Sequence, residues 1–401
     1  MIVGIEDISF YTTNQYIDLS IIADQHCVDI AKFYVGIGQE RMSIIGPDED
    51  IVTMAAAAAL PIIKNQDKES IHALFFATES SVDQSKSAGI WLHKLLGLNH
   101  SCRVVELKQA CYSATCALHM ACALVAQMPN QKILIVASDI VRYDLNSSGE
   151  PTQGCGAVVM LVSSNASILK IEHTTGLYTD DVMDFWRPNY RSTALVDGKY
   201  STKIYLQSLK AAWQDYQQKN GHDFSQFHYF CYHQPFTRMA EKAHIHLSKT
   251  VGINLSHADI EQAIGATMLY NRLIGNSYTA SLYISFVSLL DNISENLTGK
   301  RIGFFSYGSG CMAEFFSGVI QKDYLKQSHK EYHQNIINSR LPITYQVYCD
   351  LHQNIVPSHE GNLYIPHQTT GPFRLAKIEN HKRIYEKTKI STNPSGKHLS
   401  S

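Results

Sequence analysis

Three reactive side chains, Glu79, Cys111 and His233, stand where segments predicted to be buried strands end or where a helix begins. Ligands of α/β proteins bind at strand ends, so these residues are expected to meet in one site. A thiolate takes an acyl group from a thioester. A carboxylate removes a proton beside the acyl carbonyl, and an imidazole polarises or protonates a carbonyl. The three residues therefore predict acyl transfer to Cys111 followed by carbon–carbon chemistry.

The surroundings of Cys111 favour a nucleophile. Residues 103–107 alternate like a strand, and residues 112–128 are apolar at the spacing of a helix that is buried on most sides. Cys111 would lie at the N-terminus of that helix, where N–H groups and the helix dipole favour a thiolate. Backbone N–H groups of Cys111 and of the Ser309–Gly310 turn are expected to bind the thioester oxygen. The glycines at 308 and 310 would allow this close approach.

Each of these residues also has a plainer interpretation. Cys111 in this context also suits a small inert core thiol. Glu79 suits the first turn of a helix as an acid stabilised by the helix dipole. His233, which precedes Pro235, and the GSG motif at 308–310 suit ordinary turns. For Glu79, burial would raise the pKa and a helix N-terminus would lower it, and the sequence leaves the balance open.

Composition indicates a soluble globular chain of two or three domains or one large two-part core. It has 401 residues, 45% hydrophobic and 17% charged, and a net charge of −2, which gives no reason to expect nucleic acid or a membrane as partner. Nine cysteines without a C-x-x-C pair indicate free thiols in a reducing cytoplasm, and no cluster has the spacing of a metal site. The N-terminus is expected to be a strand without a charged leader.

The order of predicted elements in the second half repeats that of the first. First-half strands are expected at 1–5, 73–78, 103–107, 132–138 and 157–162, and helices at 16–33, 50–63 with a kink near Pro61, from a cap at Ser80 or Ser81 to 96, and 112–128. Second-half helices are expected at 204–216 and 278–290, and strands at 227–232, 301–305 and 313–320, with short strands and turns over 345–386.

This order makes Glu79 the counterpart of His233, Cys111 that of Asn276, and the 146–156 loop that of the GSG loop. The chain is therefore expected to have two α/β halves, 1–165 and 166–387, related by a pseudo-two-fold axis with one site between them. Residues 388–401 are rich in Pro, Gly, Ser and Lys and are expected to be a disordered tail.

Specific motifs in the same order give the chain a family resemblance. They are residues 36–39 (GIGQ), 77–80 (ATES), 109–112 (QACY), 145–154 (LNSSGEPTQG), 184–188 (DFWRP), 196–198 (VDG), 233–236 (HQPF), 275–279 (GNSYT) and 305–310 (FSYGSG). The chain resembles the bacterial-type 3-hydroxy-3-methylglutaryl-CoA (HMG-CoA) synthases of the thiolase-like superfamily, from about residue 2 to 385.

The resemblance implies a five-layer αβαβα fold, a homodimer and a mevalonate-pathway reaction. Acetyl-CoA would acylate Cys111, Glu79 would deprotonate the acetyl methyl, His233 would hold acetoacetyl-CoA, and water would release HMG-CoA. CoA thioesters would be substrates, with no further cofactor. Implied substrate-binding residues are Asp29, Lys32, Tyr143, Thr152, Phe185, Ser201, Pro235, Arg238, Lys242, Asn276 and Ser309. Asp139 and Asp184 are implied to support the site.

The chain departs from the family pattern at three places: Gln109, Arg238 in place of a common lysine, and Cys311-Met312 after the GSG loop. Three rival functions share parts of the pattern. A polyketide β-branching enzyme acting on carrier-bound β-ketoacyl groups would keep the same catalytic residues, and basic residues near a tunnel mouth would suit its carrier protein as well as CoA. A ketoacyl synthase or thiolase would lack the glutamate, and a silent scaffold would lack the intact triad.

Overall fold

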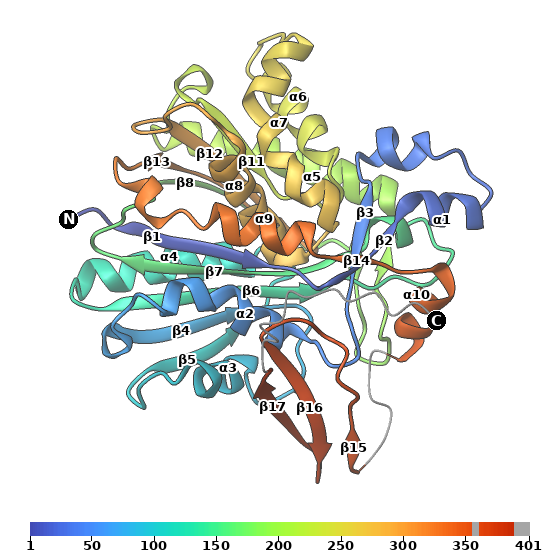
Figure 1. Ribbon diagram of the computed structural model, residues 1–401. Coiled ribbons are helices and arrows are strands. Elements are labelled where there is room, and N and C mark those ends of the chain that lie inside the picture. Colours follow the sequence, from blue (N-terminus) through green and yellow to red (C-terminus); the bar gives the residue numbers. More distant parts are fainter. Residues whose placement is uncertain (355–360, 389–401) are drawn as a thin grey trace.

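The computed structural model describes residues 1–354 and 361–388 (Figure 1). Nine strands join in the order β11-β12-β13-β8-β1-β7-β6-β4-β5. The first-half strands are β1 (Gly4–Tyr11), β4 (Ile71–Ala77), β5 (Arg103–Leu107), β6 (Lys132–Ile140) and β7 (Cys155–Ser163). The second-half strands are β8 (Leu169–Thr179), β11 (Tyr229–Tyr232), β12 (Arg301–Gly308) and β13 (Met312–Ile320). The halves meet where β1 pairs with β8 over only Gly4–Lys170 and Ile5–Leu169.

The two halves repeat one pattern of strand pairing. In the first, β1 pairs antiparallel with β7, β7 antiparallel with β6, and β6 parallel with β4. In the second, β8, β13, β12 and β11 follow with the same orientations. β4 runs directly into Thr78-Glu79 and β11 into His233, so the correspondence of Glu79 with His233 has a structural basis. β5, parallel to β4, extends the first half alone.

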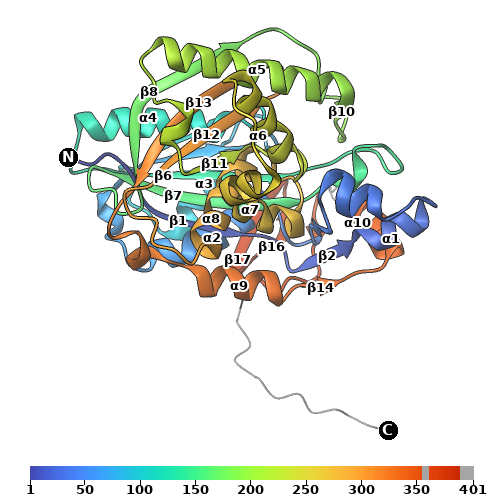
Figure 2. The same cartoon turned by 90° about the horizontal axis from the view of Figure 1, so that it is seen from above.

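Helices cover both outer faces and fill the space between the halves (Figures 1 and 2). The outer helices are α2 (Ile51–Ile63) and α3 (Ala88–Leu96) on the first half, and α5 (Gly198–Gln218) and α6 (Met239–Thr250) on the second. The central helices are α4 (Ser113–Gln127) and α8 (Ser281–Asn292). Three separate apolar cores join these helices to the strands, which gives five layers of alternating helix and sheet.

The central layer explains the apolar composition of residues 112–128. Ala114 and Leu118 of α4 and Phe286 of α8 lie in one core with Ile135 of β6 and Phe304 of β12. The stretch Ala110–Gln127 is the one described segment long and apolar enough to cross a membrane by length and composition, and half of it is buried inside the protein. A helix packed between two sheets needs the same composition.

Smaller elements surround the layered core. They are β2 (Gln15–Asp18), α1 (Leu19–Gln25), η1 (Lys32–Ile37), β3 (Arg41–Ile44), β9 (Phe185–Trp186), β10 (Leu195–Val196), α7 (His257–Ile274), η5 (Tyr278–Ala280), η6 (Tyr324–Gln327), α9 (Lys330–Asn338), β14 (Leu341–Pro342), α10 (Tyr345–Asn354), β15 (Leu363–Tyr364), β16 (Phe373–Glu379) and β17 (Lys382–Lys387). The last three strands form a separate sheet, red in Figure 1. Ion pairs from Arg374 to Asp48 and from Arg383 to Asp50 attach it to the start of α2.

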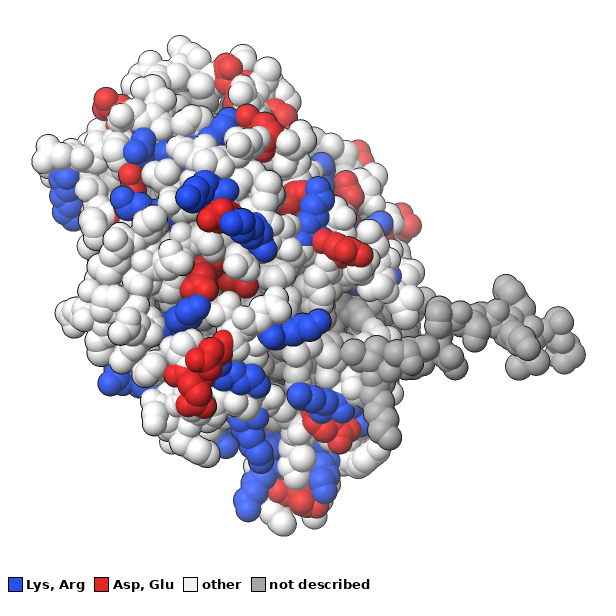
Figure 3. Space-filling model, turned by 60° about the vertical axis from the view of Figure 1, so that its left-hand side comes forward, with Lys and Arg blue, Asp and Glu red and all other residues white. Residues whose placement is uncertain are grey.

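The face shown in Figure 3 carries basic and acidic side chains intermixed, without a broad region of either sign. All nine cysteines lie within the described residues and are free thiols. In those same residues, no three His, Cys, Asp or Glu side chains gather as metal ligands would.

The structure corrects several predicted boundaries. Residues 16–33 are not one helix, because Tyr16 pairs with Ser43 in the β2–β3 ladder and α1 starts only at Leu19. The predicted helix from Ser80 starts at Ala88, with Ser87 as its cap. The Ser80 hydroxyl is instead bonded to the end of β6, which it reaches through Asp139 and Ile140.

Two further expectations concern chain ends and a proline. α2 continues through Pro61 and ends two residues later at Ile63, so the proline lies in its last turn. The backbone N–H of Thr388, placed in the predicted tail, donates to the Pro372 carbonyl at 3.0 Å. The rest of that tail, 389–401, lies outside the described residues.

Candidate active site

The Cys111 thiol donates a hydrogen bond to Glu79 Oε1 at 3.2 Å. Glu79 arrives from the end of β4, and Cys111 from the turn between the neighbouring strand β5 and helix α4. Both side chains retain partial exposure, so the pair is accessible from outside. The structure therefore brings a nucleophile and a carboxylate together, as the strand-end argument predicts.

A tight backbone approach holds Cys111 in place. Ala110 turns the chain with a φ of 43°, in the left-handed region. The β12–β13 turn packs against this loop, and a Cβ on Gly308 would lie 2.5 Å from the Gln109 carbonyl oxygen and 2.8 Å from Tyr112 Cβ. Gly308 is thus required for space, as predicted. Gly310 is required for its φ of 117° instead, since its nearest neighbour would be 3.6 Å from a Cβ.

Burial dominates the proton affinities of the pair. Burial first, and the charge of Asp139 second, raise the pKa of Glu79 to about 8. Burial and the adjacent Glu79 carboxylate also hold the pKa of Cys111 well above its usual value. Contrary to the expected effect of a helix N-terminus, the surroundings of Cys111 therefore favour the thiol over the thiolate. The open question about Glu79 is also answered, because no helix begins at this residue.

Asp139, at the end of β6, anchors the Glu79 loop and is fully buried. Its Oδ1 accepts hydrogen bonds from the Glu79 N–H at 2.9 Å and from the hydroxyls of Thr78 and Ser80, both at 2.8 Å. Its Oδ2 accepts from the N–H and the hydroxyl of Thr279, in the second half. One carboxylate therefore fixes segments of both halves around Glu79.

Asp184 likewise accepts hydrogen bonds from several segments around the site. Its carboxylate accepts hydrogen bonds from Ser201 at 2.9 Å, from the Tyr307 hydroxyl at 2.7 Å and from the Gly310 N–H at 3.0 Å. The Gly310 N–H is therefore already bonded and is not a donor for a thioester oxygen, contrary to expectation. The predicted binding residue Ser201 likewise donates to Asp184.

Aromatic residues line the site beside Cys111. Phe185 packs edge-to-face against Tyr143 and Tyr278, with ring centroids 6.1 and 5.6 Å apart. Cys111 packs against this cluster. Burial, with the nearby charges of Cys111 and Glu79, raises the pKa of Tyr143. The predicted residues Tyr143 and Phe185 thus form an apolar wall beside Cys111.

His233 is buried, with 2% exposure, at the end of β11. Its carbonyl accepts a hydrogen bond from the Tyr205 hydroxyl at 2.7 Å, and its Nδ1 has no partner. Burial lowers the pKa of His233 to about 3. Among the described residues it makes no hydrogen bond to Glu79 or Cys111. Tyr205 lies between His233 and Cys111: it binds the His233 carbonyl, and Cys111 is close enough to affect the pKa of Tyr205, which burial mainly raises.

Other predicted residues close the inner site. The Asn276 N–H donates to the Thr152 carbonyl at 3.1 Å, and the Asn276 side-chain oxygen accepts from the Tyr278 N–H at 2.9 Å. These contacts bring Thr152 and Asn276 together from different halves. The Ser309 carbonyl accepts a hydrogen bond from the Gln109 side chain at 3.3 Å, so Ser309 lies beside the Cys111 loop.

The remaining predicted binding residues form an outer group around η1 and the start of α6. Arg238 donates to the Val35 carbonyl at 2.7 Å and pairs with Glu241, which connects η1 to α6. Lys242 lies 4.9 Å from the centroid of the Phe236 ring. The outer group comprises Asp29, Lys32, Pro235, Arg238 and Lys242. Asp29, Lys32 and Lys242 are exposed and Pro235 is half-buried.

Three residues near the pair escaped the sequence interpretation: Arg187, Tyr205 and Tyr278. The Arg187 Nη2 donates to the Glu79 carbonyl. Tyr278 has a buried hydroxyl without a partner and a φ of 43°. Arg187 and Tyr278 lie inside the DFWRP and GNSYT motifs, so those motifs were the available signal. Tyr205 is one of several buried positions of α5, and the sequence carried no signal that marked it.

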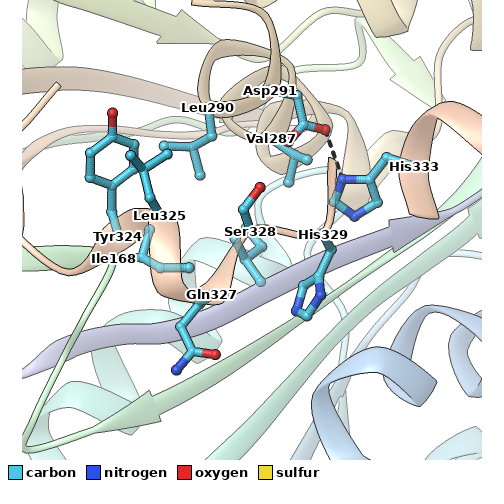
Figure 4. A pocket seen from close by; sticks show the side chains of 11 residues that line it. Ile168, Val287, Leu290, Asp291, Tyr324, Leu325, Gln327, Ser328, His329 and His333 are labelled. Atoms are coloured by element: carbon cyan, nitrogen blue, oxygen red, sulfur yellow. Dashed lines mark hydrogen bonds and ion pairs between the residues drawn. The ribbon is translucent and has the colours of Figure 1, made fainter. Parts of the chain in front are cut away.

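The cavity in Figure 4 is separate from this site. It lies beneath η6 and α9 and contains no residue of the Glu79–Cys111 pair. Its histidines are already paired, His333 with Asp291 at 2.7 Å and His329 with Asp7 at 2.8 Å. These ion pairs connect α9 and the residue before it to α8 and β1.

Comparison with known families identifies the architecture. The hydroxymethylglutaryl-coenzyme A synthase N-terminal profile matches residues 1–167, and the C-terminal profile matches 169–250 and 246–360. The chain belongs to the hydroxymethylglutaryl-CoA synthase family. This membership confirms the resemblance, the αβαβα fold with two related halves and the class of acyl-CoA condensing enzyme.

Individual relatives resemble most of the chain. The enzyme of Enterococcus faecalis is 41% identical over 87% of this chain and 91% of its own. A crystal structure of an HMG-CoA synthase complexed with CoA superposes with a TM-score of 0.91 at 37% identity, covering 97% of this chain and all of the other. The polyketide 3-hydroxy-3-methylglutaryl-ACP synthase PksG of Bacillus subtilis is 34% identical over 79% of this chain and 80% of its own.

Proposed function

We propose that this chain condenses acetyl-CoA with acetoacetyl-CoA and water to give HMG-CoA and free CoA, within the mevalonate pathway. The contact between Cys111 Sγ and Glu79 Oε1 carries the proposal, because it sets a nucleophile against a base in a partly accessible site. Membership of the hydroxymethylglutaryl-CoA synthase family supports the choice of substrates.

The first step acetylates Cys111. The Cys111 thiol gives up its proton and the sulfur of the departing CoA takes up one, so protons balance over the step. The Cys111 sulfur bonds the acetyl carbon as the bond to CoA breaks. A pKa of about 8 suits Glu79 for accepting and returning a proton near neutral pH.

The second step forms the carbon–carbon bond. Glu79 removes a proton from the acetyl methyl, and the resulting enolate attacks the ketone of acetoacetyl-CoA. His233 remains neutral because its pKa is about 3, so its unpaired Nδ1 edge is suited to hydrogen bonding with a carbonyl. Water then cleaves the thioester and restores the Cys111 thiol.

Substrate binding is divided between the inner and outer groups. Lys32, Arg238 and Lys242 offer positive charge for the phosphates of CoA, and Pro235 and Asp29 lie with them on the same rim. Tyr143, Thr152, Phe185, Ser201, Asn276 and Ser309 surround the acyl end. CoA thioesters are substrates here, and no further cofactor enters the reaction.

The test is mass spectrometry of purified protein mixed with acetyl-CoA, followed by acetoacetyl-CoA. An acetyl adduct on the Cys111 peptide that disappears as HMG-CoA forms is the expected result. If Cys111 were not acetylated, the proposed function would be wrong.

A second candidate is condensation on a β-ketoacyl group carried by an acyl carrier protein. It is favoured by the similarity to PksG and by exposed basic residues, which would also suit an acidic carrier surface. The greater identity to the Enterococcus faecalis enzyme favours free CoA. If the enzyme turned over the carrier-bound substrate but did not turn over acetoacetyl-CoA, the second candidate would replace the first.

We also propose a homodimer in the cytoplasm. Family resemblance supports the dimer, and β5 supports it physically, because this edge strand exposes Val105 (38%) beside a helix that exposes Met120 (42%). Nine free thiols support a reducing compartment. Light scattering after size-exclusion chromatography tests the dimer, and Val105→Lys should shift it towards monomer.

A further inference from the structure

Arg187 places a cation beside Glu79. It follows β9 in the second half, and its Nη2 donates to the carbonyl oxygen of Glu79 in the first half. Its charge also lowers the pKa of Glu79, against the larger effect of burial. The guanidinium therefore lies against the backbone of Glu79 and close enough to its carboxyl to affect the pKa of that group.

This cation has no counter-ion among residues 1–354 and 361–388. The other arginine of the same loop, Arg191, pairs with Asp144 at 2.6 Å, whereas Arg187 makes no ion pair. The buried carboxylates of the site, Asp139 and Asp184, accept hydrogen bonds from hydroxyl and backbone donors. Arg142 adds a second positive charge nearby.

Glu79 does not supply the missing charge at neutral pH, because a carboxyl with a pKa of about 8 is mostly protonated there. A half-buried, unpaired guanidinium loses hydration without gaining an ion pair. Guanidinium groups bind carboxylates through two parallel hydrogen bonds. The site is thus prepared for an anion that arrives during the reaction.

The proposed function creates such an anion, and the inference rests on that function. In the last step a water oxygen bonds the acyl carbon on Cys111 as the carbon–sulfur bond breaks. One water proton restores the thiol and the other leaves, so the former acetyl carbonyl becomes a carboxylate. That carboxylate forms at the sulfur, beside Glu79 and Arg187.

We propose that Arg187 binds the newly formed carboxylate of the product. The acetyl group and the ketone of acetoacetyl-CoA carry no charge, so this interaction strengthens only as hydrolysis proceeds. An interaction of this kind assists a step without tightening substrate binding. Arg187 would also distinguish HMG-CoA from acetoacetyl-CoA in the resting enzyme.

Equilibrium binding by calorimetry tests the proposal in a Cys111→Ala background, where no turnover occurs. Arg187→Gln should weaken HMG-CoA binding about 10- to 100-fold, the effect of removing one charged hydrogen-bond partner, and change acetoacetyl-CoA binding less than about threefold. Arg187→Lys should fall between wild type and Arg187→Gln. The control Arg191→Gln removes a paired arginine from the same loop and should change neither affinity.

Equal weakening of both ligands, or weakening of neither, overturns the proposal. A shifted pH profile without a change in the HMG-CoA to acetoacetyl-CoA ratio also overturns it, because Arg187 would then act only on Glu79. Acetylation of Cys111 is measured separately in the Cys111-containing proteins. A wild type that fails to acetylate overturns the proposed function as well, whereas normal acetylation and turnover with unchanged selectivity overturn the Arg187 role alone.

Discussion

The thiol of Cys111 donates a hydrogen bond to Oε1 of Glu79 at 3.2 Å, and the two residues act in different steps of the proposed reaction. Cys111 supplies the sulfur that carries the acyl group, and Glu79 the base that acts on it. Their pKa values are raised together by burial, so neither is charged in the resting site at neutral pH. Substitutions at the two positions should therefore separate acylation from condensation.

Cys111→Ala should abolish acetyl-enzyme formation, because the sulfur is the site of covalent attachment. Mass spectrometry of the intact protein after mixing with acetyl-CoA measures this directly. Cys116→Ala is the matched control, since Cys116 lies on the same helix and is also partly exposed. A covalent acetyl group that survives in Cys111→Ala would contradict the assignment.

Glu79→Ala should still accumulate acetyl-Cys111 but should fail to condense. The Cys111 sulfur keeps its place before α4 in this variant, so it can still take the acetyl group. Loss of a general base costs roughly 2–4 powers of ten in rate. Single-turnover quench experiments starting from the acetyl-enzyme measure the condensation, and an unchanged rate would exclude Glu79 from proton transfer.

Condensation should accelerate as the pH rises through about 8. Glu79 acts as base only when ionised, and its raised pKa leaves it mostly protonated at pH 7. His233 should add no inflection near 6.5, because its pKa of about 3 keeps it neutral. The pH dependence of single-turnover condensation checks both points. A plateau already reached at pH 6 would show that Glu79 ionises normally.

Asp139→Asn should destabilise the protein by about 1–3 kcal/mol, because an amide NH₂ would face donors that now bond a carboxylate oxygen. The Glu79 loop should loosen and condensation should slow. Denaturant unfolding measures the free energy, and Asp144→Asn, an exposed aspartate of the adjoining loop, serves as control. Equal stability of Asp139→Asn and wild type would mean that the buried carboxylate contributes nothing.

Gly308→Ala should destabilise by about 1–3 kcal/mol, the usual cost of overpacking. Its Cβ would meet the Gln109 carbonyl oxygen and Tyr112, so the Cys111 loop should shift and acetylation should slow. Thermal unfolding and the acetylation rate measure the two effects. Gly198→Ala provides the comparison, because a Cβ there meets nothing within 4 Å.

The strand-end residues could be placed from the sequence because buried apolar runs locate strands and their ends. Glu79 after 71–77 and His233 after 229–232 follow from that rule. The duplication could be anticipated because both halves order their elements alike. These are local patterns of hydrophobicity, which short stretches of sequence record.

The remaining details depend on contacts between distant segments. The helix expected at Ser80 is displaced because Asp139, on another strand, binds the Ser80 hydroxyl. The Gly310 N–H is unavailable because Asp184 accepts it from across the site. Arg187 reaches Glu79 over a long sequence separation. Propensity and spacing contain no information about such partners.

Asp139 has a further consequence through its attachment to Thr279. Five hydrogen bonds reach its two oxygens, and those from Thr279 come from the opposite half. A fragment ending at residue 165 would leave Oδ2 without these two donors. If the chain arose by doubling of a shorter ancestor, that ancestor would have functioned as a pair of identical subunits, each completing the other's catalytic loop.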